Sequence, residues 1–223
     1  MIKQGISLFF MLIFGSALLF SQEIVTAERY LELVSDNYAS IRDYEANITI
    51  RSGNSDMSGS VSYLTPSYIR IDFTRPADQV IVFNREILTI YLPEFRAVLS
   101  QEVNSTRSVM ATSQGLSILR TRYVPSFLTS PNPEPLDSNS NERVVKLRLS
   151  RRSVSEGFRE ITLSINADTK LIRRIEGTTI AGGEVRFDFT NIRTNLGIPE
   201  ARFIYDAPAN ANMYNNFLFR DSE

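Results

Sequence analysis

The feature that most constrains the fold is a stretch between Tyr63 and Pro93. It contains three consecutive runs in which apolar residues occupy alternate positions. It reads YLTPSYIRIDFTRPADQVIVFNREILTIYLP, with Pro66, Pro76 and the pair Asn84-Arg85 between the runs. Apolar residues on alternate positions are typical of half-buried strands, because successive side chains of a strand point to opposite faces. The stretch therefore predicts neighbouring antiparallel strands that form a sheet with one apolar face.

The same two-residue period extends over most of the chain. Gly53-Asn54, Asn166 to Asp168 and Gly182-Gly183 mark turns between the alternating runs, and no repeat of fixed period is present. We expect about ten strands, in an antiparallel meander. They are predicted at 44–51, 60–64, 68–74, 79–83, 86–92, 95–101, 142–150, 158–166, 171–178, 184–191 and 201–205.

Two segments have a helical pattern instead. Apolar residues recur at helical spacing from Glu28 to Tyr44, and Thr26 is a suitable N-cap. One or two short helices are expected between Ser108 and Tyr123, because Gly115 interrupts the pattern. Residues 125–141 are rich in Pro, Ser and Asn and are expected to form a mobile surface loop. The predicted fold is α+β: one strongly curved antiparallel sheet with helices over one face.

The beginning of the chain has the composition of an export signal. Lys3 precedes an almost wholly apolar run from Ile6 to Phe20, which is shorter than the ~20 residues of a spanning helix. We expect cleavage after Ser21, with Ala27 as an alternative, which leaves residues 22–223 as a single exported domain. An uncleaved membrane anchor is the alternative. The chain has no Cys, so it carries no disulfide and no amino-terminal lipid of its own.

Composition excludes most enzyme chemistry. Without His or Cys, the Ser-His and Cys-His nucleophilic pairs and the usual zinc, copper and haem ligands are absent. The net charge of −1 and scattered Arg residues provide no footprint for nucleic acid. We expect no cofactor, no metal and no enzymatic activity. A large sheet with an apolar face and no reactive constellation favours binding of an apolar molecule.

Two readings of other classes remain open at this point. An envelope hydrolase that uses paired carboxylates, such as a glycosidase, has candidate acids on separate predicted strands, with no spacing that pairs them. A structural envelope protein with a filled interior is the other reading. The candidate acids are Glu45, Asp72, Glu86 and Asp188.

The order and spacing of several segments resemble the periplasmic outer-membrane lipoprotein carrier family, LolA. The resemblance begins with the signal peptide, the first helix and the first strand and covers nearly all of residues 22–223. Its family-like segments are Pro66–Phe73, Thr74-Arg75-Pro76, Gln79–Val82, Leu88–Pro93, Phe187–Ile192 and Phe203–Pro208.

This sequence departs from the family pattern at several positions. Ile71 and Thr89 stand where the family has Trp, and Asn84-Arg85 replaces an Asp-Gly turn. Thr65 stands where the carrier has an Arg that ties the sheet to its helical cover and helps drive release of cargo. Membership in the superfamily is therefore better supported by these residues than the exact carrier cycle.

The resemblance implies an unclosed β-barrel of about 10–11 strands with helices across its opening as a lid. It implies a monomeric, non-enzymatic carrier that binds lipoprotein acyl chains, loaded by an inner-membrane ATP-driven release complex and emptied by an outer-membrane acceptor. An envelope lipid-binding or stress-sensing module with the same half-barrel is the alternative. The implied acyl-chain cavity comprises Ile48, Ile50, Ile69, Ile71, Phe73, Val82, Ile90, Leu147, Leu163, Phe187 and Phe189. The implied lid residues are Leu31, Val34, Tyr38, Met110, Leu116 and Leu119.

Overall fold

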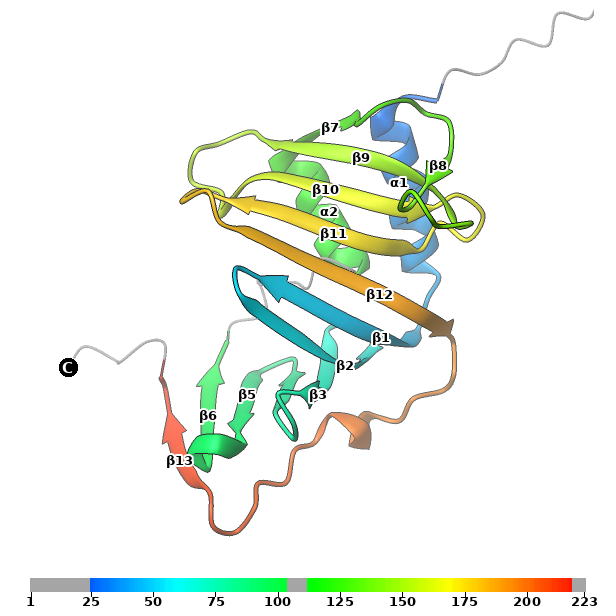
Figure 1. Cartoon of the computed structure of the whole chain (residues 1–223). Coiled ribbons are helices and arrows are strands. Elements are labelled where there is room, and N and C mark those ends of the chain that lie inside the picture. The colour runs from blue at the N-terminus through cyan, green and yellow to red at the C-terminus, as the bar shows by residue number, and fades with distance from the viewer. Residues whose placement is uncertain (1–24, 104–111, 218–223) are drawn as a thin grey trace, which may run out of the picture.

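The computed structural model describes residues 25–103 and 112–217, which form one sheet and its helical cover (Figure 1). The sheet has 13 strands, in the order β13-β6-β5-β4-β3-β2-β1-β12-β11-β10-β9-β7, with β8 paired to β9 off this path. The strands are β1 Asp43–Ser52, β2 Ser55–Leu64, β3 Tyr68–Arg75, β4 Val80–Asn84, β5 Ile87–Leu92, β6 Ala97–Glu102, β7 Tyr123–Phe127, β8 Glu134–Pro135, β9 Arg143–Arg151, β10 Phe158–Asn166, β11 Ile172–Thr179, β12 Glu184–Thr194 and β13 Asn212–Asn215.

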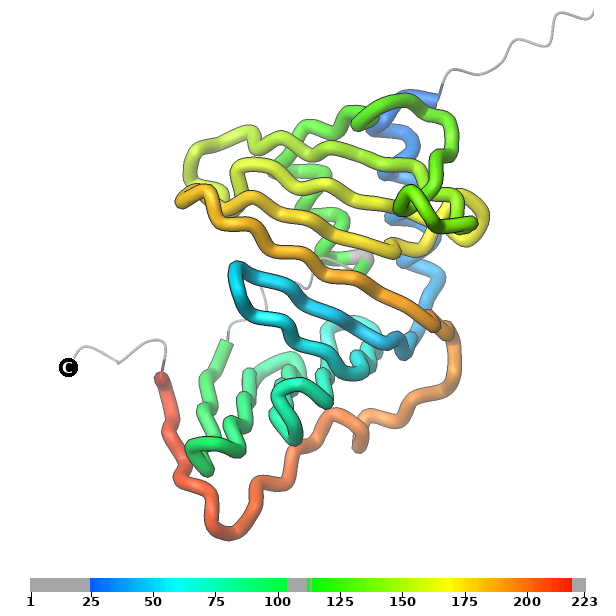
Figure 2. Tube along the Cα trace, viewed as in Figure 1, coloured from blue at the N-terminus to red at the C-terminus, as the bar shows by residue number. Residues whose placement is uncertain are grey.

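The chain path explains the shape of the sheet. Adjacent strands pair antiparallel, except for β13, which lies parallel to β6. Strands β9 to β12 run across the view in Figures 1 and 2, whereas β5, β6 and β13 run up it, so the sheet twists strongly along its length. This curved, unclosed sheet confirms the predicted fold.

Two α-helices lie on one side of the sheet, behind β9 to β12 in Figure 1. Helix α1, Ala27–Ala39, begins at the predicted cap, where the Thr26 hydroxyl accepts a hydrogen bond from the Arg29 amide at 3.2 Å. It ends before the predicted Tyr44, because β1 already begins at Asp43. Neither helix in the described part of the chain is long and apolar enough to cross a membrane.

Helix α2, Ser113–Arg122, tolerates the glycine that was expected to interrupt it. Gly115 lies in the first turn, where its amide donates to the Thr112 hydroxyl at 3.0 Å and so satisfies a donor that has no partner within the helix. The loop expected at residues 125–141 contains the end of β7 and the short β8.

The predicted last strand at 201–205 is wrong. This segment begins with a short 3₁₀ helix, η2, Glu200–Phe203, which follows Pro199. The other 3₁₀ helix, η1, Pro93–Phe95, lies in the turn between β5 and β6. Phe203 is buried and Tyr205 is partly exposed. The two aromatic residues at alternate positions therefore do not mark a strand. Three short strands that periodicity did not reveal, β7, β8 and β13, also join the sheet.

Candidate functional site

Two rows of apolar side chains cross the face of the sheet that the helices cover. The first row spans β2 to β6 and follows the strand register through Val61, Ile71, Ile81, Ile90 and Leu99. The second row spans β2, β1 and β12 to β9, and its residues are Met57, Ile50, Phe187, Ile175, Leu163 and Leu147. Since facing side chains in register share one side of a sheet, each row is a continuous apolar track.

Exposure increases along this face away from the helices. Leu147 and Leu163 are completely buried, whereas every residue of β5 is partly exposed. Ile71 and Ile81 are also half-buried and pack against the edge of the main core cluster. The apolar face therefore extends from a covered half to a half that is accessible at its surface.

The structure brings ten of the eleven predicted cavity residues to this face. Nine of them belong to the main core cluster or pack against it, and Ile90 shares the row of Ile81 by register. The ten are Ile48, Ile50, Ile69, Ile71, Phe73, Ile90, Leu147, Leu163, Phe187 and Phe189.

Val82 does not lie on this face. It pairs with Arg70 and Thr89, whose side of the sheet is opposite to that of Ile69 and Ile71. There it packs in a second cluster with Leu64, Ile198 and Phe203. The error arose because β4 is apolar on both faces, so alternation alone did not show which face each residue occupies.

Helices α1 and α2 contribute the predicted lid residues. Leu31, Val34 and Tyr38 of α1 and Leu116 and Leu119 of α2 belong to the main core cluster, and Met110 lies outside the described residues. Leu31, Val34 and Leu116 have no solvent-exposed surface. The helices are thus held to the sheet mainly by apolar packing.

A small number of polar contacts supplement this packing. The Tyr38 hydroxyl accepts a hydrogen bond from the Ile172 amide at 3.0 Å, and the Asn37 side chain donates to the Thr169 carbonyl at 3.1 Å. Ser67, in the turn before β3, donates to Gln114 of α2 at 2.9 Å. Each of these three contacts is an ordinary hydrogen bond, worth about 0.5–1.5 kcal/mol net, and adds little to the apolar packing.

The space beneath α1 is filled by the protein's own side chains. The apolar cavity between Tyr38, Tyr44, Ala46 and Phe189 has a volume of about 10 Å³, which is barely the size that one water molecule requires. The expected ready-made hollow is therefore not present at this place. A hydrocarbon tail fits there only if the helix moves.

The tyrosines of this interior are buried. Burial raises the pKa of Tyr38 to about 12 and the pKa of Tyr30 to about 12. Burial also raises the pKa of Tyr44 well above its ordinary value. The Tyr30 hydroxyl is buried with no hydrogen-bond partner among the described residues. Neutral phenols in a buried apolar layer fit an apolar occupant.

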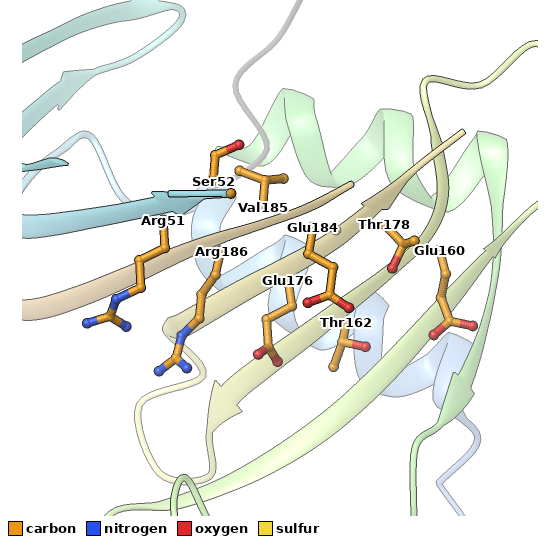
Figure 3. Close-up of a pocket in the computed structure, with 11 residues that line it drawn as sticks. Arg51, Ser52, Glu160, Thr162, Glu176, Thr178, Glu184, Val185 and Arg186 are labelled. Atoms are coloured by element: carbon orange, nitrogen blue, oxygen red, sulfur yellow. The ribbon is translucent and has the colours of Figure 1, made fainter. Parts of the chain in front are cut away.

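Over β1 and β10 to β12, the opposite face of the sheet is polar. Figure 3 shows arginine and glutamate side chains, including Arg51, Glu176 and Arg186, on the side away from the helices, around an open hollow of about 600 Å³. Asp188 accepts hydrogen bonds nearby from Arg174 at 2.6 Å and from Arg186 at 2.7 Å. The sequence did not lead us to predict this network. Arg and Asp residues at outward-facing positions of neighbouring strands are the pattern that indicates it.

Three of the four candidate acids, Glu45, Asp72 and Asp188, are held in ion pairs with arginines. Asp188 is neutralised by its arginines, and Glu45 pairs with Arg193 at 2.9 Å. Burial acts to raise the pKa of Asp72, but the guanidinium groups of Arg70 and Arg202 outweigh it and lower that pKa below its ordinary value. Asp72 and Asp188 are thus structural anions. Among the residues that the structure describes, no group of three acidic side chains is arranged to hold a metal ion.

The fold and the site define an open half-barrel with an apolar inner face under a helical cover. The chain belongs to the family described as outer membrane lipoprotein carrier protein LolA, whose model matches residues 49–206. This membership confirms the predicted family.

Individual relatives are distant. The chain is 24% identical to an outer-membrane lipoprotein carrier protein of Bordetella avium over 157 residues, which is 70% of each chain. It is 28% identical to a protein of the same name from Leptothrix cholodnii over 161 residues, 70% of this chain and 68% of the relative.

Solved structures share the fold. An uncharacterized conserved protein from Thermus thermophilus superposes with a TM-score of 0.57 at 15% identity, over 85% of this chain and 98% of the other. The complex of MucA and MucB from Pseudomonas aeruginosa gives a TM-score of 0.52 at 15% identity, over 81% of this chain and 61% of the other. At such identities the likeness establishes the half-barrel architecture.

Proposed function

We propose that this protein is a carrier that binds the acyl chains of lipoproteins on its apolar face and moves them between the inner and outer membranes. The observation that supports this most directly is the apolar track Val61-Ile71-Ile81-Ile90-Leu99, which runs from the core into the half-exposed part of the sheet. Family membership supports the choice of lipoproteins as cargo. The proposed role is binding, because Glu45, Asp72 and Asp188 are held in ion pairs with arginines.

Energetics favours a carrier over a store. Burial of one methylene group from water is worth about 0.8 kcal/mol, so complete burial of several long chains from water would exceed the ~18–21 kcal/mol limit of non-covalent binding. The relevant starting state is a membrane, where the chains are already buried. The free energy of transfer of the chains from membrane to protein is then roughly zero. The free energy needed to open the helical cover is an added cost.

Opening is the first step of the proposed cycle. Helices α1 and α2 pack on the sheet through Leu31, Val34 and Leu116, so their displacement exposes apolar surface that an acyl chain covers again. An inner-membrane ATP-driven complex supplies the work of loading, and an outer-membrane acceptor with higher affinity removes the cargo. The chain works in the periplasm after removal of residues 1–21 as a signal peptide.

Charged substitutions on the apolar face test the proposal. We expect Ile71→Glu and Phe187→Glu each to weaken binding of a triacylated lipopeptide by about tenfold or more, because a carboxylate then faces the acyl chain. Both side chains are only partly buried, so the fold persists. Binding is measured by calorimetry, with the deacylated peptide as the ligand control and Ile204→Glu, at a position 64% exposed, as the matched variant.

A cross-link tests the movement of the cover. Because the chain has no cysteine, Ser67→Cys combined with Gln114→Cys places a unique thiol pair where the turn before β3 meets α2. A short bis-maleimide between these thiols should abolish lipopeptide binding, while each single variant treated alike retains it. Undiminished binding by the cross-linked, correctly folded protein, or by the Glu variants above, would show that the chains bind elsewhere.

A further inference from the structure

Two hairpin turns at one end of the sheet expose aliphatic side chains to solvent. The turn between β9 and β10 carries Val154, which is 78% exposed, and the turn between β11 and β12 carries Ile180, which is 51% exposed. The turns lie at the same end because Phe158 pairs with Thr179 just behind them. Figures 1 and 2 show both turns at the left end of the sheet. We call residues 151–159 and 179–184 the hairpin tips.

Arginine side chains stand beside both aliphatic residues. The Arg151 guanidinium donates a hydrogen bond to the Val154 carbonyl at 3.4 Å, and the Arg159 guanidinium donates to the Ile180 carbonyl at 3.0 Å. Arg152 is exposed next to Arg151. These contacts keep positive charge within one turn of each exposed aliphatic group.

The local charge is positive although the whole chain is not. The hairpin tips contain three arginines and two glutamates, Glu156 and Glu184. Glu156 is already engaged by Arg122 of α2 at 3.2 Å. The hairpin tips thus carry a net charge of +1, whereas the chain as a whole has a net charge of −1, and Glu160, which follows Arg159, is paired with Arg148 at 3.4 Å.

We propose that the hairpin tips dock on the surface of an anionic lipid bilayer. Val154 and Ile180 enter the boundary between headgroups and acyl chains, and Arg151, Arg152 and Arg159 contact lipid phosphates. A bilayer suits these tips, because each presents an exposed aliphatic side chain beside an arginine, the combination of apolar and positive groups that an anionic membrane surface binds. This docking does not depend on what the apolar face of the sheet binds.

Vesicle flotation tests the docking. The protein is produced from the full chain and purified in the form that the cell yields, so that all variants share one amino terminus. We expect binding to vesicles of phosphatidylglycerol and phosphatidylcholine that weakens at high salt, and at least fivefold weaker binding to pure phosphatidylcholine. The double variant Val154→Ser, Ile180→Ser and the double variant Arg151→Gln, Arg152→Gln should each bind the anionic vesicles at least fivefold more weakly.

Matched controls come from the other end of the molecule. Ile204 and Met213 are 64% and 55% exposed, so Ile204→Ser with Met213→Ser removes similar apolar surface and should leave vesicle binding unchanged. A fluorophore on Val154→Cys should shift to the blue on anionic vesicles, and one on Met213→Cys should not. Failure of the parent protein to float, an equal loss in the control, or equal shifts at both labelled sites would overturn the proposal.

Discussion

At the scale of single residues, Gly59 shows how closely the apolar face is built. It lies in β2 opposite Phe73 and Ile48, where the register between β2 and β3 shifts after Ser58. A β-carbon at this position would lie 2.2 Å from the Asp72 carbonyl oxygen, which belongs to the neighbouring backbone. Only the absence of a side chain lets β2 and β3 approach at this irregularity.

Substitution of Gly59 should therefore be costly. We expect Gly59→Ala to lower the free energy of unfolding by about 1–3 kcal/mol, because the added methyl group forces two paired strands apart. Chemical denaturation measures the change. Gly157→Ala is the matched control, since a β-carbon there meets no atom within 4 Å. Equal stability of the two variants would contradict the tight approach of β2 and β3.

At the scale of elements, helix α1 depends on protonated tyrosines. Burial raises the pKa of Tyr38 to about 12, whereas an unfolded tyrosine titrates near pH 10. The folded state thus favours the neutral phenol. The stabilisation that follows is complete below pH 10 and is lost as the pH rises from about 10 to about 12.

Alkaline titration should loosen α1. We expect the free energy of unfolding to fall between pH 10 and pH 12, with Tyr38 contributing up to about 1.4 kcal/mol per pH unit. Tyr38→Phe removes this contribution but leaves the Ile172 amide without its acceptor, so the variant starts about 1–3 kcal/mol less stable at pH 8. Denaturant unfolding at several pH values measures both effects. Identical pH slopes for the two proteins would exclude Tyr38 as a titrating group.

The elements also show what the sequence reveals and what it conceals. Alternation located the strands of the meander, and helical spacing located α1, because each element buries one face. Alternation could not place Val82, since Val80, Ile81, Val82 and Phe83 form a continuous apolar run. The strands β8 and β13 carry no apolar periodicity, because they are edge pairings held by backbone hydrogen bonds. The filled interior depends on side-chain packing, which periodicity does not encode.

At the scale of the whole molecule, the segment from Asn195 to Phe217 binds the outer face of the sheet. Asp43 is completely buried, and its carboxylate accepts hydrogen bonds from the amides of Leu196 at 2.6 Å and Gly197 at 3.1 Å. Beyond this anchor, Phe203 is buried in the second cluster, and β13 pairs with β6. The carboxyl-terminal segment thus packs against the strands of the first half of the sheet and adds β13 to the edge of that half.

Removal of the Asp43 anchor should release this segment. Asp43→Ala leaves two amides without an acceptor, so we expect the free energy of unfolding to fall by about 1–3 kcal/mol. Limited proteolysis should cleave the variant within residues 195–211 faster than the parent protein. Asp36→Ala, at an exposed position in α1, serves as the control and should leave the cleavage rate unchanged. Protection of the Asp43 variant equal to that of the parent would refute the anchoring role.

The sheet described above ends in two strands, β7 and β13, that never meet. A closed barrel fixes its circumference, because every strand is bonded on both sides. Here the edge strands β7 and β13 can move apart or together while the hydrogen bonds between neighbouring strands stay intact. An open sheet can therefore change the distance between β7 and β13 without the loss of a strand pairing.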